Sequence, residues 1–392
     1  MGTSETDSGL VPMHDAAVLR DQARQMLDLH RAGTTTMADS EHRVPVGVFC
    51  DPERFERERR EVFRSLPLVA GLSCELRHPG AFTTFSPDGV PIVLVRSDDG
   101  GLGAFLNVCR HRGAQVVGGT GCSRRLSCPY HAWTYASDGS LVGIPGAEGF
   151  VGVDRGDHGL VPVPCEERHG MMFVVADPDG ALDLDRWLGP LDEELPHLHL
   201  DRLHHVGTRD MPTACNWHVN MDTNTESYHF ASLHGASIGP FTMSNLNVVA
   251  PFGRSQRLTF AACTLPDLAD QPESEWEPES HLQFVYLLFP NNSLLITGDH
   301  VELFRILPGP TVDTSVTHQS YYARRPVETD DERFLAEAQF DLFHGVVRDE
   351  DLPCAETIQR GFTSGANTHL TFGRNEPALH HLHREQAALL DG

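Results

Sequence analysis

The sequence predicts an α+β protein in which a small antiparallel β domain is inserted near the front of a larger α+β domain. Between residues 67 and 180, short apolar strands alternate with Gly, Pro, Asp and Ser, which is typical of β-hairpins. Segments with helical patterns precede and follow this region, and a second β-rich stretch covers 281–308. A chain of 392 residues is long enough for two such domains.

Two helices are predicted ahead of the β region. Residues 13–32 place apolar side chains at helical spacing. Residues 51–63 are strongly charged, with Asp51 as the expected N-cap and Pro52 at the first helical position. The clearest strands follow within 80–108 and 169–180.

The C-terminal half should contain a helix over 218–234, an exposed acidic loop at 270–280 and a long helix from about residue 330. The long helix is expected to bury one apolar face whose residues recur at three- and four-residue steps: Leu335, Ala338, Leu342 and Val346.

The composition limits the partners and the compartment. The formal net charge is −25 and all 30 basic residues are arginines, so a surface for nucleic acid is not expected. No apolar run approaches the ~20 residues that span a bilayer, so no membrane contact is expected. Nine scattered cysteines without a secretory signal indicate reduced thiols in the cytoplasm, some of them used as ligands.

Two cysteine–histidine pairs occur in the β region, each in a loop marked by Gly or Pro. Cys109-x-His111 precedes Cys128-x-x-His131. A structural zinc usually takes two cysteines from one loop and two histidines from the next. The order found here suits an iron–sulfur cluster in which each loop gives a thiolate to one iron and an imidazole to the other. Cys122 lies between the pairs and is expected to be an ordinary loop thiol.

A second constellation lies in residues 216–234, NWHVNMDTNTESYHFASLH. On a helix Glu226 and His229 would share a face but His234 would not, so the helix must bend or end between the histidines if both bind one metal. Two histidines and a carboxylate form the facial triad of non-haem Fe(II) oxygenases. With 23 histidines in the chain, the spacing by itself would also fit two surface histidines.

Both constellations resemble the terminal oxygenase (α) component of Rieske non-haem iron oxygenases, the aromatic ring-hydroxylating dioxygenase large-subunit family. CRHRGA and CPYHAW match the two loops of its Rieske [2Fe-2S] cluster, and the acidic-x-Tyr-His-x4-His run after Asn-Trp matches its mononuclear iron motif. The resemblance covers nearly the whole chain. It implies a [2Fe-2S] cluster with the cysteines on the buried iron and the histidines on the outer one: Cys109, Cys128, His111 and His131.

The resemblance also implies a mononuclear non-haem Fe(II) bound by His229, His234 and a carboxylate far downstream. Three consecutive candidates stand at 349–351. The family's spacing to a later Glu and Gln selects Asp351 and leaves Asp349 and Glu350 as a solvated acidic turn.

Glu226 is implied to bridge the two metal centres, accepting hydrogen bonds from the iron-binding histidine and from a cluster histidine of a neighbouring subunit. His218 stands where a Lys is usual, and it is not expected to touch the metal. The implied fold is a Rieske domain inserted in a helix-grip (START/Bet v 1-like) catalytic domain, divided into an N-terminal helical arm (1–45), the Rieske domain (46–165) and the mononuclear-iron domain (166–392).

The implied activity is that of the terminal oxygenase of a multicomponent system. It would use O2 and electrons from NAD(P)H to hydroxylate, dihydroxylate or oxidatively demethylate a small organic substrate that is aromatic or apolar. Because no G-x-G-x-x-G fingerprint occurs, a separate flavin reductase or ferredoxin must supply the electrons. The alternatives are an amine-bearing or aliphatic substrate, and a non-catalytic Rieske-type electron-transfer or binding protein. A homotrimer is the family's assembly.

Three further expectations concern the surface and the substrate pocket. Arginines flanking the cluster loops suggest a docking patch for an acidic electron donor: Arg110, Arg112, Arg124 and Arg125. The run HHLH at 380–383 should be solvated rather than a third metal site. The pocket should be lined from the sheet at 235–310, with the following apolar candidates: Phe230, Leu233, Met243, Leu246 and Phe260.

Overall fold

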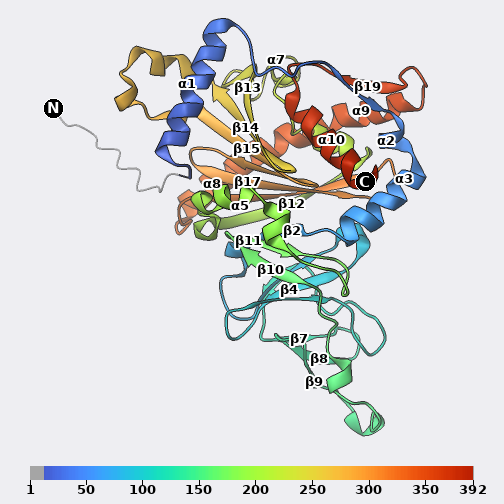
Figure 1. The fold of residues 1–392 in the computed structure, drawn as a ribbon. Coiled ribbons are helices and arrows are strands. Elements are labelled where there is room, and N and C mark those ends of the chain that lie inside the picture. The colour runs from blue at the N-terminus through green and yellow to red at the C-terminus, as the bar shows by residue number, and fades with distance from the viewer. Residues whose placement is uncertain (1–12, 392) are drawn as a thin grey trace, which may run out of the picture.

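The structure, a computed structural model, describes residues 13–391 and shows a large α+β part from which a small β part projects (Figure 1). The large part is built on a seven-stranded antiparallel sheet in the order β12-β18-β17-β16-β15-β14-β13. Its strands are β12 (His204–Thr213), β13 (Thr242–Phe252), β14 (Ser255–Ala262), β15 (Leu282–Leu288), β16 (Asn292–Ile296), β17 (His300–Pro308) and β18 (Ser315–Ala323). Because β12 and β13 form opposite edges, residues 214–241 between them cross from one edge of the sheet to the other.

The small β part contains a four-stranded and a three-stranded sheet. Their strands are β3 (Ala81–Phe85), β4 (Ile92–Arg96), β5 (Leu102–Leu106), β6 (Thr120–Cys122), β7 (Arg125–Ser127), β8 (Thr134–Ala136) and β9 (Leu141–Gly143). A further sheet pairs the strand that enters this part with those that leave it: β2 (Leu68–Leu72), β10 (Cys165–Arg168) and β11 (Met171–Val174). The predicted strands and their antiparallel arrangement are confirmed.

The helices cover the two faces of the large sheet. They are α1 (Ala16–Ala32), α2 (Gly47–Cys50), α3 (Pro52–Glu58), α4 (Leu184–Leu188), α5 (Leu191–Glu194), α6 (Trp217–Asp222), α7 (Phe230–Leu233), α8 (Asp330–Val346), α9 (Leu352–Phe362) and α10 (Pro377–Asp391). One face of the sheet shares a core with α1, α4 and α5, and the other shares a core with α6 and α10. None of the described helices is both long and apolar enough to cross a membrane.

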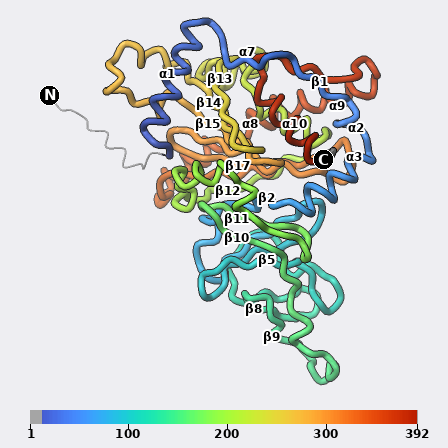
Figure 2. The backbone as a smooth tube through the Cα atoms, viewed as in Figure 1, coloured from blue at the N-terminus to red at the C-terminus, as the bar shows by residue number. Residues whose placement is uncertain are grey.

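Both predicted N-terminal helices are present. Asp15 caps α1 by accepting from Ala17 N, and Asp51 caps α3 by accepting from Glu53 N at 2.8 Å. Helix α3 continues as a π-helix over Arg59–Arg64. After α1 the chain forms β1 (His42–Pro45), which pairs with β19 (His369–Phe372), so segments near both ends of the chain lie side by side (Figure 2).

The expected apolar face of the long helix is wrong for Leu335, Ala338 and Leu342, which are exposed. The side chains of α8 that are buried are Ala336, Phe340, His344 and Val346. The helix is rotated from the hydrophobic pattern because the sheet beneath it is partly polar: His344 Nδ1 lies 2.9 Å from the Gln319 oxygen of β18. A π-helical turn, Val347–Asp351, joins α8 to α9.

Two other expectations need correction. The segment 218–234 is not one helix, because α6 ends at Asp222 and turns separate it from α7. The HHLH run is not solvated, since His380 and His383 are 2% and 4% exposed. His383 Nε2 lies 2.9 Å from the Asp222 carboxylate, so α10 is anchored to the helix that precedes the histidine motif.

A buried carboxylate joins α3 to α6. Glu58 is 1% exposed and accepts hydrogen bonds of 2.9 Å from Trp217 Nε1, His218 Nε2 and Arg54 Nε. Burial opposes its ionisation, but these partners outweigh that effect and lower the pKa of the Glu58 carboxyl. His218, which departs from the family pattern, therefore has a structural partner in Glu58.

We expect Glu58→Ala to lower the free energy of unfolding by about 3 kcal/mol or more, because it leaves buried polar groups without a partner. Glu61→Ala is the matched control, since Glu61 lies on the same helical segment and forms only an exposed ion pair with Arg57. Its effect should stay within about 0.5 kcal/mol. Urea unfolding of both variants measures the difference, and equal losses would contradict the role given to Glu58.

Candidate metal centres

The two cysteine–histidine loops follow strands β5 and β7 of the small β part. Cys109 and Cys128 are each 3% exposed, whereas His131 is exposed and His111 partly so. Each loop is closed by backbone hydrogen bonds at its cysteine, from Cys109 N to Ala114 O and from Cys128 N to Trp133 O. The thiols are therefore directed inward and the imidazoles outward.

The imidazoles of the two loops meet at the surface. The rings of His111 and His131 are 4.7 Å apart, and His111 stacks on Trp133 at 4.9 Å. His111 Nδ1 is buried but has no hydrogen-bond partner in the described part of the chain. Tyr135 donates its hydroxyl to Cys109 Sγ at 3.4 Å. Two buried thiols and an imidazole nitrogen without a partner fit a cluster with mixed sulfur and nitrogen ligands.

The second centre brings together His229, His234 and Asp351, called the triad below. The Nε2 atoms of the two histidines are 3.1 Å apart, and Asp351 Oδ1 lies 3.5 and 3.1 Å from them. This oxygen is buried and has no hydrogen-bond partner in the described part of the chain. The turns after α6 place the histidines together, and the π-helical turn after α8 brings the carboxylate to them.

Each histidine of the triad is oriented by a second carboxylate. His229 Nδ1 bonds to Glu226, which also accepts the backbone N–H groups of Tyr228 and His229. His234 Nδ1 lies 2.7 Å from Glu350 Oε2. When both Nδ1 atoms donate to carboxylates, both Nε2 atoms present lone pairs to each other and to Asp351. Three lone pairs directed at one another repel unless a cation lies among them. The triad therefore fits a metal ion.

The electrostatics of the triad agree with this geometry. Burial opposes protonation of His229, but the nearby carboxylates of Asp351 and Glu226 prevail and raise its pKa to about 9. Burial also opposes ionisation of Asp351, and the two histidines reverse this effect and lower the pKa of its carboxyl.

Glu350 corrects the expectation of a solvated acidic turn. Besides His234, it accepts the hydroxyl of Ser237 at 2.8 Å. Asp349 does fit the expectation, since its side chain is 59% exposed and pairs with Arg348. The sequence does not distinguish Glu350 from Asp349, because the π-helical turn determines which of the consecutive carboxylates face inward.

A pocket of about 280 Å³ opens onto the triad. Its apolar lining comprises Phe230, Ile238, Phe241, Phe260, Val285, Leu295, Phe304, Leu342, Phe343, Val346 and Val347. Phe241 and Leu342 are 70% and 55% exposed and mark its mouth. Of the pocket residues expected from sequence, Phe230 and Phe260 are found in the lining. Leu233 is not among them, and Met243 and Leu246 line a separate surface groove beside α1.

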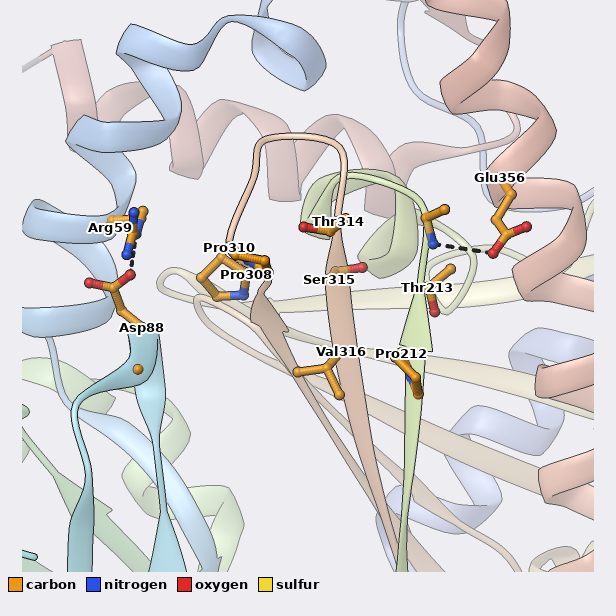
Figure 3. A pocket seen from close by; sticks show the side chains of 13 residues that line it. Arg59, Asp88, Pro212, Thr213, Pro308, Pro310, Thr314, Ser315, Val316 and Glu356 are labelled. Atoms are coloured by element: carbon orange, nitrogen blue, oxygen red, sulfur yellow. Dashed lines mark hydrogen bonds and ion pairs between the residues drawn. The ribbon is translucent and has the colours of Figure 1, made fainter. Parts of the chain in front are cut away.

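A second cavity, of about 730 Å³, lies between the π-helix after α3, the β3–β4 turn and one end of the large sheet (Figure 3). It contains none of the predicted ligands. Its charged groups are paired, Asp88 with Arg59 and Glu356 with the backbone N–H of Ala214 (Figure 3). Among the described residues, the triad pocket combines a cavity with candidate metal ligands.

The fold and the two centres define a protein that carries an iron–sulfur cluster in a small β domain and a metal triad in a larger one. Family models agree with this division: residues 67–162 match the Rieske [2Fe-2S] domain, and residues 200–392 match the ring hydroxylating alpha subunit (catalytic domain).

Known proteins match along most of the chain. The carnitine monooxygenase oxygenase subunit of Escherichia coli is 30% identical over 82% of this chain and 84% of its own length. The glycine betaine monooxygenase oxygenase subunit of Chromohalobacter salexigens is 29% identical over 93% and 86%. A crystal structure of a quaternary ammonium Rieske monooxygenase with an inhibitor superposes with a TM-score of 0.76 at 22% identity, covering 94% of this chain and 98% of that one.

The chain belongs to the Rieske non-haem iron oxygenases, as an oxygenase α subunit. It is an oxidoreductase whose Rieske domain carries a [2Fe-2S] cluster and whose catalytic domain binds mononuclear non-haem iron. The fold class and the cofactors expected from the sequence are confirmed.

We expect Glu350→Ala to weaken iron binding at the triad by about 10- to 100-fold, because His234 loses the partner that fixes its ring. The measurement is iron retained during titration with a chelator, with the cluster absorbance as an internal reference. Asp349→Ala removes a neighbouring carboxylate that faces solvent, and it should retain iron like the unaltered chain. Equal retention by both variants would show that Glu350 does not position His234.

Proposed function

We propose that this protein is the terminal oxygenase of a multicomponent system that oxidises a small, largely apolar organic molecule bound beside the triad. The observation that carries this proposal is the position of the triad at the wall of a 280 Å³ pocket lined mainly by apolar side chains. Such a pocket can hold a small substrate near the metal while it excludes water.

We assign the cluster to Cys109, His111, Cys128 and His131, and the mononuclear iron to the triad. The convergence of the triad and the inward thiols support this assignment. When bound, the iron supplies the redox chemistry that activates O2. Glu226 and Glu350 hold the imidazoles with Nε2 inward, and the apolar wall presents a C–H bond of the substrate to the centre.

Hydroxylation in this pocket would consume one O2, two electrons and two protons, placing one oxygen atom in the substrate and releasing the other as water. The electrons come from NAD(P)H through a separate ferredoxin or flavin reductase. Dihydroxylation and oxidative demethylation use the same components and differ in the fate of the oxygen atoms.

The charges around the pocket favour a substrate without a carboxylate. The chain has no lysine, and no arginine lines the pocket among the described residues. An anionic group of the substrate would therefore lack a cationic partner. Glycine betaine and carnitine carry such a group, so the substrates named for the relatives do not match this lining in full.

A second candidate is a compound bearing an alkylated ammonium group, the amine alternative. Five phenylalanines line the pocket, and aromatic faces stabilise quaternary ammonium groups. The relatives named for carnitine and glycine betaine also favour it. An uncharged substrate remains the first proposal because the lining is mainly apolar.

Turnover with the holoprotein and a surrogate reductase–ferredoxin pair tests the proposal. We expect indane to yield a hydroxylated product that contains one atom from ¹⁸O2, and glycine betaine to yield no formaldehyde. Asp351→Ala should abolish the product and lower the iron from about three to about two per chain, because the cluster remains. Formaldehyde from glycine betaine without oxidation of indane would favour the second candidate, and full activity of Asp351→Ala would contradict the assigned triad.

We also propose that the arginines beside the cluster loops bind the electron donor. Arg110, Arg112, Arg124 and Arg125 are all exposed, and the nearest carboxylate contact among them joins Arg124 to Asp98 at 3.6 Å. A positive patch on a chain of net charge −25 would attract an acidic ferredoxin or flavin reductase.

We expect Arg124→Glu/Arg125→Glu to lower kcat/KM for the donor about tenfold at low salt, because the charge attraction is reversed. The difference should shrink at high ionic strength, where charges are screened. Arg31→Glu, at an exposed site on α1, is the control and should leave the rate unchanged. An unchanged kcat/KM in the double variant would contradict the proposed docking patch.

A homotrimer is proposed as the assembly, with Glu226 as the bridge between the metal centres of neighbouring subunits. An exposed tyrosine flanks each centre: the Tyr130 ring lies 3.7 Å from the His131 ring, and Tyr228 precedes His229. Exposed aromatic side chains are frequent at protein interfaces, which supports contact between the two centres. Sedimentation equilibrium would show whether the mass is three times that of the chain.

A further inference from the structure

Cross-strand pairs of the large sheet make the floor of the triad pocket. Residues directly opposite in an antiparallel pair project to the same face. Three such pairs line the pocket: Phe260 with Gln283, Val285 with Leu295, and Ser293 with Phe304. Four of these side chains are apolar, so the amide of Gln283 and the hydroxyl of Ser293 interrupt an otherwise hydrophobic surface.

Most polar groups of the lining, unlike Gln283, have hydrogen-bond partners elsewhere in the described chain. Ser237 donates to Glu350, Asn224 donates to the Asn220 carbonyl, and Glu226 is occupied by His229. The side-chain amide of Gln283 makes no such bond within residues 13–391, although the residue is only partly exposed. An amide that faces an apolar cavity without a partner is unfavourable, and a bound molecule can relieve this cost.

Thr242 adds a second free group beside Gln283. It lies on β13 and pairs with Ala262 of β14. Phe260, the strand partner of Gln283, is two residues from Ala262 on the same strand. Thr242 lines the same pocket. Thr242 is 3% exposed, and its hydroxyl makes no hydrogen bond within the described chain. The β13–β15 side of the pocket therefore offers a donor–acceptor amide and a hydroxyl to one ligand.

The position of Gln283 relative to the triad follows from ring contacts. The Phe230 ring lies 5.6 Å from the His234 ring and 5.6 Å from the Phe260 ring, and Phe260 is the strand partner of Gln283. A run of two phenylalanine rings thus connects the triad to the strand position of the amide. A ligand that bonds to Gln283 would lay its apolar body along these rings.

We propose that Gln283 is a specificity-determining residue, whose amide hydrogen-bonds a neutral polar group on an otherwise apolar substrate. A carbonyl or hydroxyl group suits it, because the amide both donates and accepts. The apolar part of the substrate, remote from this group, then faces the triad and is the part that is oxidised. This inference rests on the proposed function, since it concerns the same pocket and substrate.

The test compares indane with 1-indanone, which differ by one carbonyl oxygen. Calorimetric titration of the anaerobic holoprotein without reductase measures binding in the absence of turnover. For Gln283→Leu, we expect the ratio of the 1-indanone Kd to the indane Kd to rise about tenfold over that of the unaltered chain, because one hydrogen bond is lost. Gln283→Glu keeps the length but not the donor, and it should raise the ratio similarly.

Leu295→Met is the matched control, because it reshapes the same floor without changing hydrogen bonding and should shift both Kd values together. An unchanged ratio in Gln283→Leu would overturn the role of Gln283 while leaving the apolar pocket intact. If the unaltered holoprotein bound neither compound, both this inference and the uncharged-substrate proposal would be wrong. Cluster absorbance and iron content of each variant confirm that the centres are retained.

Discussion

The arrangement of the catalytic domain depends on one constraint, that two imidazoles and a carboxylate must turn their lone pairs toward a common point. The Nε2 atoms of His229 and His234 face each other at 3.1 Å, with Asp351 Oδ1 beside them. Without a cation this arrangement is unfavourable, and the fold maintains it with carboxylates on the opposite ring nitrogens. Glu226 and Glu350 orient the two imidazoles, the segment 214–241 carries them, and the π-helical turn Val347–Asp351 brings the carboxylate to them.

The seven-stranded sheet makes the constraint compatible with a substrate pocket. The segment 214–241 crosses the sheet from edge to edge, so the histidines lie above a floor of cross-strand pairs. Helix α8 closes the other side, and the same element leads directly to Asp351. The metal ligands and the substrate wall therefore belong to the same few elements, and the shape of the pocket is linked to the position of the ligands.

The sequence predicted the chemistry more fully than the packing. The Cys-x-His and Cys-x-x-His pairs and the histidine spacing were recognisable because ligand spacing is local and the residue types are few, whereas Asp351 was selected only through the resemblance to the family. The face that α8 buries was not recognisable, because Gln319 of the sheet pairs with His344, whereas the hydrophobic periodicity predicts an apolar contact. Glu350 and His383 were also missed, because their partners lie more than a hundred residues away in sequence.

The π-helical turn at Val347–Asp351 has a further consequence for how such a site can change. A wide turn contains one residue more than an ordinary helical turn, and removing a residue from it would narrow the turn between α8 and α9. Each position beyond the deletion would rotate by about 100° relative to α8, since an α-helix has about 3.6 residues per turn. The carboxylate would then leave the imidazoles although no ligand had been substituted. Loss of one residue near position 348 would therefore remove a ligand of the triad without changing the cluster residues, which all precede residue 132.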